Sequence, residues 1–284
     1  MRIETSRRNF LGAATSIGGL AAIGATPASA VIEPEPWGVK LGIATYSLRS
    51  FDRPTAIEML KKMHVKYISI KDVHLKIGEP AAGTKAGRAE FDAAGFTVTS
   101  GGNVSMTRGT TVDSLRPQFE YAKAAGLPMM VCAPTHENIK SVEALVKEYD
   151  IRIAIHNHGP EDKNFPTPQS VLDVVRKLDK RCGLCMDVGH SACTGIDVVK
   201  AIAGASDRLF DMHVKDLTDL LKIESQVDIG DGVIPFVAIF KQLHKQGYTG
   251  CVNMEYEINA KDPMMGMQRS LSYMRGMLAA LAAA

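Results

Sequence analysis

Residues 152–190 read RIAIHNHGPEDKNFPTPQSVLDVVRKLDKRCGLCMDVGH. An apolar run predicts a strand at Arg152–His158, and apolar residues spaced three and four apart predict a helix at Pro168–Leu178. A second apolar run predicts another strand at Cys182–His190. A strand, a helix and a strand in this order indicate a parallel βαβ unit.

The same alternation extends to both sides of this unit. Six further strands are predicted, at Val39–Leu48, Tyr67–Val73, Thr97–Val104, Pro128–Ala133, Arg208–Lys215 and Gly250–Glu257. Helical patterns lie at Pro54–Met63, Val112–Ala125, Glu137–Tyr149 and Phe236–Gln246, and glycines typical of helix ends stand at Gly95, Gly126 and Gly247. This alternation predicts an α/β fold, the (β/α)8 TIM barrel. A doubly wound open sheet is the alternative, although no glycine-rich phosphate loop follows the first strand.

The N-terminal residues show the pattern of an export signal. Ser6–Gly12 reads SRRNFLG, a twin-arginine motif, and an apolar run at Leu11–Ile23 and the small residues Ala28–Ala30 follow it. These features predict a twin-arginine signal peptide over residues 1–30 and a single catalytic domain over residues 31–284, beginning at Val31. We therefore expect a periplasmic or secreted protein, with no membrane attachment after signal removal. A disordered N-terminus or a retained anchor is the alternative.

The charge of the domain excludes some classes of partner. Without residues 1–30, the chain keeps 30 of its 33 basic and 30 of its 31 acidic residues. A formally neutral domain has no electrostatic basis for binding nucleic acid or an anionic membrane as its main partner. The odd number of cysteines, five, is a poor disulfide framework. Cys182 and Cys185 are expected to be buried strand thiols, with a redox or zinc pair as the alternative.

Titratable residues gather at the ends of the predicted strands, where a TIM barrel carries its catalytic groups. Five of the eight histidines fall there, namely His74, His156, His158, His190 and His213, and the acids there include Asp187, Glu255 and Glu257. Because strand residues two apart share a face, His156 and His158 point the same way, as do Glu255 and Glu257. Converging imidazoles and carboxylates favour one divalent ion, Mn, Zn, Co or Fe in preference to Mg. A hydrogen-bonded rim without metal is the alternative.

Five phrases at these strand ends resemble the xylose-isomerase-like sugar phosphate isomerase/epimerase superfamily, which includes ketose 3-epimerases, inosose dehydratases and endonuclease IV. The phrases are Ile155–Gly159 (IHNHG), Met186–His190 (MDVGH), Met212–Asp216 (MHVKD), Ile229–Gly232 (IGDG) and Met254–Glu257 (MEYE). The resemblance implies a TIM barrel with one divalent metal, held by a set of Glu, Asp, His and Glu. It assigns three of these ligands to Asp187, His213 and Glu255, whereas the first Glu is replaced by His156.

The departures from the family pattern affect the expected chemistry. Because His156 replaces one glutamate of an acid–base pair, symmetric epimerisation by two carboxylates is in doubt. We expect Glu255, His158 and Lys71 to be catalytic, with His158 in proton transfer and Lys71 stabilising an enolate. A Lys71 that only pairs with Asp72 is the alternative. The other polar residues of the rim are expected to bind substrate: His74, His190, Lys215 and Glu257.

The resemblance and the export signal together predict a class of enzyme. We expect a metal-dependent sugar isomerase or epimerase that forms an enediolate on a keto sugar or a 3-keto-glycoside. The alternatives are a lyase or dehydratase of oxidised sugars and a non-catalytic periplasmic sugar-binding barrel. A nuclease like endonuclease IV conflicts with the neutral charge. Barrels of this superfamily often pair, so a homodimer is also expected.

Overall fold

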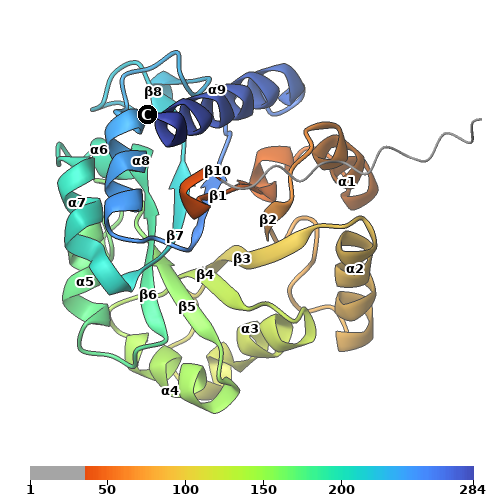
Figure 1. The fold of residues 1–284 in the computed structure, drawn as a ribbon. Helices are drawn as coiled ribbons and strands as arrows, with labels where there is room; N and C mark the ends of the chain where they lie inside the picture. Colours follow the sequence, from red (N-terminus) through yellow and green to blue (C-terminus); the bar gives the residue numbers. More distant parts are fainter. Residues whose placement is uncertain (1–35) are drawn as a thin grey trace, which may run out of the picture. The chain divides into compact units, whose positions relative to one another are not determined.

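The structure is a computed structural model that describes residues 36–284. The predicted signal peptide, residues 1–30, and the expected domain start at Val31 lie outside the described residues. Within residues 36–284, eight parallel strands close into a barrel in the order β1-β10-β7-β6-β5-β4-β3-β2 (Figure 1). The closed barrel confirms the predicted TIM-barrel fold and excludes the open doubly wound sheet.

Each barrel strand lies beside its neighbour in sequence, and helices connect most of them. The strands are β1 Lys40–Ala44, β2 Tyr67–Ile70, β3 Thr97–Ser105, β4 Met129–Ala133, β5 Arg152–His156, β6 Cys182–Asp187, β7 Leu209–Val214, β8 Asp216–Leu217, β9 Gln226–Val227 and β10 Cys251–Met254. The helices are α1 Arg53–Lys62, α2 Ala81–Ala93, α3 Val112–Ala124, α4 Ile139–Tyr149, α5 Pro168–Val175, α6 Val188–Ala192, α7 Val198–Ala205, α8 Phe236–Lys245 and α9 Met264–Ala283. The short strands β8 and β9 form a separate antiparallel pair.

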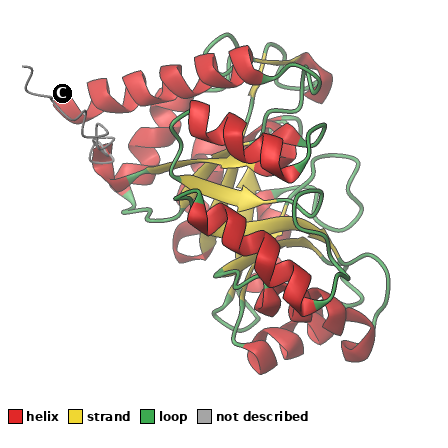
Figure 2. Cartoon of the chain, turned by 90° about the vertical axis from the view of Figure 1, so that its right-hand side faces the viewer, coloured by secondary structure: helices red, strands yellow, loops and turns green. Residues whose placement is uncertain are grey.

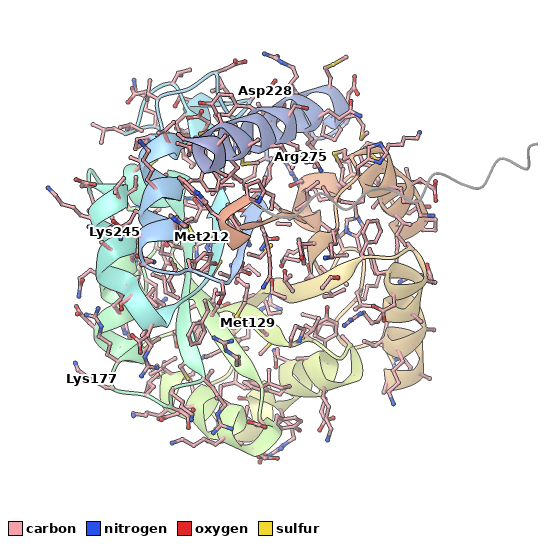
Figure 3. All side chains as sticks on the ribbon, in the orientation of Figure 1. Met129, Lys177, Met212, Asp228, Lys245 and Arg275 are labelled. Atoms are coloured by element: carbon pink, nitrogen blue, oxygen red, sulfur yellow. The ribbon has the colours of Figure 1, made fainter. Side chains whose placement is uncertain are left out.

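The helices surround the sheet (Figure 2), and the main apolar core lies between the two layers. A smaller apolar cluster includes Met129, Ala154 and Cys185, and by alternation the last two share the face of His156 and Asp187. Met129 and Met212 are labelled in Figure 3, and Met212 belongs to the main core instead. The barrel interior is therefore packed below its C-terminal end, which leaves that end to carry the polar residues.

Polar caps and glycines set the ends of several helices. Thr111 and Thr167 begin α3 and α5 with reciprocal capping bonds to the serine three residues later. The predicted helix-end glycines Gly95, Gly126 and Gly247 all have positive φ, of 88°, 58° and 64°. A left-handed backbone costs glycine little, so these positions end their helices as expected.

The C-terminal helix α9 also contacts the start of the domain. Arg275, labelled in Figure 3, donates to the main-chain oxygens of Met63 and His64, at 3.1 and 2.8 Å, just after α1. These bonds join the last helix to the first. Among residues 36–284, no helix is both long and apolar enough to cross a membrane.

Six predicted barrel strands, those that correspond to β1, β2, β5, β6, β7 and β10, end earlier than expected, and two of these ends are followed directly by a helix. After Ala44 the chain turns into a 3-10 helix at Thr45–Leu48, and β6 ends at Asp187 instead of His190. At the second boundary the Asp187 carboxylate accepts from the His190 amide at 2.8 Å and so begins α6. A side-chain cap outweighed the apolar pattern there.

Candidate metal centre

Four neighbouring strands bring four titratable side chains together at the C-terminal end of the barrel. β5, β6, β7 and β10 are consecutive in the barrel. His156 and Asp187 end β5 and β6, His213 lies next to the end of β7, and Glu255 follows β10 directly. Asp187 and His213 are register partners, and the Glu255 amide donates to the Val214 oxygen at 2.9 Å. The strand register therefore sets the site.

The four side chains form one buried cluster. Their ligand atoms all lie within 4.8 Å of one another. His213 Nδ1 is 3.1 Å from both His156 Nε2 and Glu255 Oε1, and His156 Nε2 is 3.6 Å from Asp187 Oδ2. All four residues are buried, Asp187 and His213 completely. The cluster brings together the four residues that the sequence analysis expected as metal ligands.

Asp187 uses its two carboxylate oxygens differently. Oδ1 accepts from the His190 amide, while buried Oδ2 accepts no hydrogen bond from the described residues and has the Lys215 ammonium 3.1 Å away. The Asp187 main chain is held by Asn157, whose Oδ1 accepts from the Asp187 amide at 3.1 Å. A buried carboxylate oxygen without a hydrogen bond is costly unless a cation neutralises it. This oxygen and its imidazole neighbours fit the donor set of a divalent metal.

Lys215 supplies one positive charge beside the cluster. Its completely buried ammonium lies 3.1 Å from Asp187 Oδ2 and 3.0 Å from Glu255 Oε2, and it also pairs with Glu257. Gly189 leaves room for it, because a Cβ there would lie 2.5 Å from Lys215 Cγ. When both imidazoles are neutral, as metal ligation requires, the three carboxylates carry two more charges than this ammonium balances. One divalent cation would supply the difference.

The two cluster imidazoles differ in protonation. Burial holds the pKa of His156 well below its usual value, and the neighbouring imidazoles lower it further, so its ring is neutral and can donate a lone pair. Burial opposes protonation of His213, but its interactions with Cys185 and the Glu255 carboxylate raise its pKa well above the usual value, so without a metal this ring holds a proton that a bound cation would have to displace. Burial also raises the pKa of Cys185 to about 12, so its thiol is a weaker ligand candidate than Asp187.

Two of the predicted catalytic residues meet through a third that the sequence analysis missed. The His158 and His156 ring centroids are 4.3 Å apart, and His158 Nε2 lies 2.7 Å from Asn103 Nδ2. Lys71 Nζ donates to the Asn103 main-chain oxygen at 2.6 Å and pairs with Asp72 at 3.1 Å. The expected alternative for Lys71, pairing with Asp72, is thus present in the structure. Asn103 lies near the end of β3, a strand whose polar end was not considered.

The predicted substrate-binding histidines differ in their surroundings. Both ring nitrogens of buried His74 have partners, the Thr45 hydroxyl at 3.0 Å and the Phe51 oxygen at 3.2 Å. The His190 ring instead lies 5.9 Å from that of His158, centroid to centroid, and 6.1 Å from that of His156. His190 therefore borders the cluster, whereas His74 is engaged with the first loop of the barrel. A role for either in substrate binding remains a prediction.

The glycine-rich phrase at residues 229–232 has a structural partner in Asp216. The buried Asp216 carboxylate accepts from the amides of Leu217, Gly230, Gly232 and Ile234, at 2.9 to 3.1 Å. A Cβ at Gly232 would lie 2.3 Å from Asp216 Oδ1, so only glycine fits there. These bonds fix the loop that follows β9, and neither residue belongs to the four-residue cluster.

The fold and the site thus define a TIM-barrel protein with a buried cluster of side chains that could hold a metal ion at the C-terminal end of its barrel. The chain belongs to the xylose isomerase-like TIM barrel family, whose profile matches residues 55–277. This match confirms the family suggested by the strand-end phrases.

Part of the chain is similar in sequence to several curated proteins. The rhizopine catabolism protein MocC of Rhizobium meliloti is 29% identical over 125 residues, 39% of this chain and 38% of the relative. The chain spans less than half the length of the curated relatives it matches.

Solved structures extend the likeness to nearly the whole barrel. The IOLI protein with a zinc atom has a TM-score of 0.69 at 17% identity, covering 85% of this chain and 99% of that one. D-psicose 3-epimerase from Clostridium cellulolyticum H10 with D-tagatose has a TM-score of 0.67 at 18% identity, covering 84% and 99%. At these identities the likeness establishes the fold alone.

Proposed function

We propose that this chain is a metal-dependent enzyme that removes a proton from the carbon next to a carbonyl group in a keto sugar or 3-keto-glycoside. The observation that carries the proposal is the buried cluster of His156, Asp187, His213 and Glu255. The zinc atom of the IOLI protein and the epimerase activity named for the Clostridium structure are consistent with it. A bound divalent ion would polarise the substrate carbonyl and its neighbouring hydroxyl oxygen, which acidifies the adjacent C–H.

The residues around the cluster have separate parts in this reaction. His158 is the proton acceptor, because its ring lies beside the cluster and is a third exposed, so a substrate can reach it. Lys71 is less than a fifth exposed and offers a positive charge to the oxygen that becomes negative. Lys215 holds the carboxylates of Asp187, Glu255 and Glu257 in place. The enediolate that results is common to isomerisation, epimerisation and elimination.

A second candidate is the elimination of a β-oxygen from an oxidised sugar. The observation that favours it is His156, which stands where the family pattern has a glutamate. The groups on the two sides of the substrate are then chemically different, an imidazole and a carboxylate. Such an asymmetric pair suits a reaction in which one group takes a proton and another assists a leaving oxygen. A sugar-binding barrel without turnover is the non-catalytic alternative.

Isotope exchange tests the proposal and separates the candidates. Metal-loaded protein is incubated with a panel of ketoses and 3-keto-glycosides in deuterated water, and the products are analysed by NMR and mass spectrometry. Deuterium at the carbon next to the carbonyl is expected, and product identity distinguishes isomerisation, epimerisation and elimination. If the metal-loaded protein binds sugars but exchanges no C–H hydrogen in any of them, the proposal is wrong and the non-catalytic sugar-binding barrel is supported instead.

Metal content tests the ligand assignment directly. Asp187→Ala is expected to lose the metal and all turnover, because it removes a completely buried carboxylate from the cluster. His158→Ala should reduce turnover and retain the metal. Asp113→Ala, at a side chain that is 94% exposed, is the matched control and should change neither. Elemental analysis of the purified variants gives the result, and full metal content in Asp187→Ala would contradict the assignment.

We also propose export by the twin-arginine route, which carries folded proteins and so permits metal loading before transport. The support is the order of the arginine pair, the apolar run and the small residues within residues 1–30. An exported enzyme would meet free or oxidised sugars and glycosides more often than phosphorylated sugars. This preference is the reason to place 3-keto-glycosides in the substrate panel. The oligomeric state, for which a homodimer is expected, is testable by light scattering.

A further inference from the structure

The loop after β5 places a carboxylate behind the His158 ring. Asp162 Oδ2 lies 3.2 Å from His158 Nδ1, on the side of the ring away from the Asn103 contact. The Asp162 side chain is 17% exposed and that of His158 is 33% exposed. Asp162 lies four residues after His158 and was not among the expected site residues.

The loop itself holds the Asp162 carboxylate in this position. Oδ1 accepts from the amides of Asn164 and Phe165, at 2.7 and 3.2 Å. The His158 amide donates to the Phe165 oxygen at 3.1 Å, which closes the loop at its base. Gly159 permits the turn with a φ of 84°. The carboxylate is therefore oriented before any ligand binds.

The two contacts of His158 determine which nitrogen carries the proton. Burial raises the pKa of Asp162, but the bonds from His158 and from the Asn164 and Phe165 amides outweigh this effect and lower the pKa to about 2. An ionised carboxylate only accepts, so His158 Nδ1 must carry a hydrogen. In the neutral ring Nε2 then has the lone pair, which accepts from the Asn103 amide at 2.7 Å.

The Asn103 amide itself is incompletely satisfied. Its Oδ1 is buried and has no hydrogen-bond partner among residues 36–284. A hydroxyl group of the substrate can donate to this Asn103 oxygen, while the Nε2 lone pair of His158 accepts a proton from the substrate. His158 Nε2 thus lies on the side of the ring that faces Asn103, and Nδ1 lies on the side that faces Asp162.

From this geometry we propose that Asp162 is a positioning residue that fixes His158 as the Nδ1–H tautomer, so that Nε2 takes the substrate proton. The inference rests on the proposed function and specifies its proton acceptor. In the step, the C–H bond next to the carbonyl breaks and its electron pair moves towards the carbonyl oxygen. The N–H bond forms at Nε2, and the Asp162 carboxylate stabilises the resulting imidazolium. The proton returns to carbon or to a leaving oxygen, so no oxidant or reductant is needed.

The tautomer is measurable without a substrate. The zinc-loaded full chain is labelled with ¹⁵N-histidine, and long-range ¹H–¹⁵N correlation spectra distinguish protonated from unprotonated ring nitrogens. The His158 signals are assigned from the spectrum of His158→Gln. The wild type is expected to show Nδ1–H, and Asp162→Asn should shift His158 towards Nε2–H. An Nε2–H ring in the wild type, or an unchanged tautomer in Asp162→Asn, overturns the inference.

Kinetics on the same variants separate positioning from a structural role. Asp162→Asn should lower kcat by about 10²–10⁴-fold with KM and zinc content little changed, since only the orientation of the base is lost. Asp162→Glu, which retains the carboxylate, should recover part of the rate, and Asp113→Asn is the control. An equal loss of rate in the Glu and Asn variants counts against the inference. A wild type inactive on every substrate would instead refute the proposed function, while the spectra would still decide the tautomer.

Discussion

Replacing Lys215 by methionine tests the charge balance of the metal centre. Methionine nearly matches the length of the buried side chain but leaves the carboxylates of Asp187, Glu255 and Glu257 without their ammonium partner. Breaking a buried ion pair on one side costs about 3–5 kcal/mol. For a domain of this size, a loss of 1 kcal/mol lowers Tm by roughly 2–4 °C. The metal-free variant should therefore melt about 6–20 °C below the metal-free wild type.

Zinc should act in the opposite direction on the same variant. With the ammonium removed, the site carries one more uncompensated negative charge, so a divalent cation is expected to bind at least as tightly as in the wild type. At a zinc concentration 100 times the Kd, binding stabilises the folded protein by about 2.7 kcal/mol. The rise in Tm from EDTA to zinc should consequently be as large as in the wild type or larger.

Thermal and urea unfolding followed by circular dichroism, in EDTA and in zinc, provide the measurement. Lys200→Met is the matched control, because that lysine side chain is 85% exposed and its ion pair with Asp197 contributes little. A metal-free Lys215→Met protein within about 1 kcal/mol of the wild type would refute the reasoning. It would mean that the cluster carboxylates are not held as a charged group by this lysine.

Two further predictions concern a second buried carboxyl group and the N-terminus. Burial raises the pKa of Asp211 from 3.8 to about 6, so the folded state keeps a proton that the unfolded state releases, and stability falls as pH rises from 3.8 through about 6. In EDTA, Asp211→Asn should therefore gain stability relative to the wild type over this range, by at most about 3 kcal/mol above pH 6. Urea unfolding at several pH values measures the free energy of unfolding of both proteins. A difference between them that does not change with pH would contradict the prediction. Changing Arg7 and Arg8 together to lysine should leave the full-length chain in the cytoplasmic fraction, while the control Arg2→Lys is exported normally. Immunoblots of cell fractions measure the location of each variant. Unchanged export of the double variant would refute the twin-arginine route.

The amino-acid sequence alone determined the fold class and most of the cluster. Strands alternating with helices predicted the closed barrel, because parallel strands need helical connections and a domain of this length accommodates eight such units. The rule that catalytic groups follow barrel strands then selected a larger group of titratable residues, which includes the four of the cluster. The resemblance to the xylose isomerase-like family assigned Asp187, His213 and Glu255 as ligands and put His156 in the place of the first glutamate. Four side chains at the ends of four strands are predictable because barrel closure brings all strand ends to one rim.

Only the tertiary structure decided which of these groups contact one another, and how. Strand register set Asp187 beside His213, and the cap on α6 left Asp187 Oδ2 facing the cluster. Lys215, after β7, reached the carboxylate that ends β6 and the two that follow β10, a contact that no local pattern encodes. Asp162 reached His158 through a turn in the irregular loop after β5. The path of this loop depends on its own hydrogen bonds, and its residues follow no helix or strand periodicity. Periodicity predicts the direction of a side chain within an element, whereas loop conformation and register depend on the packed barrel.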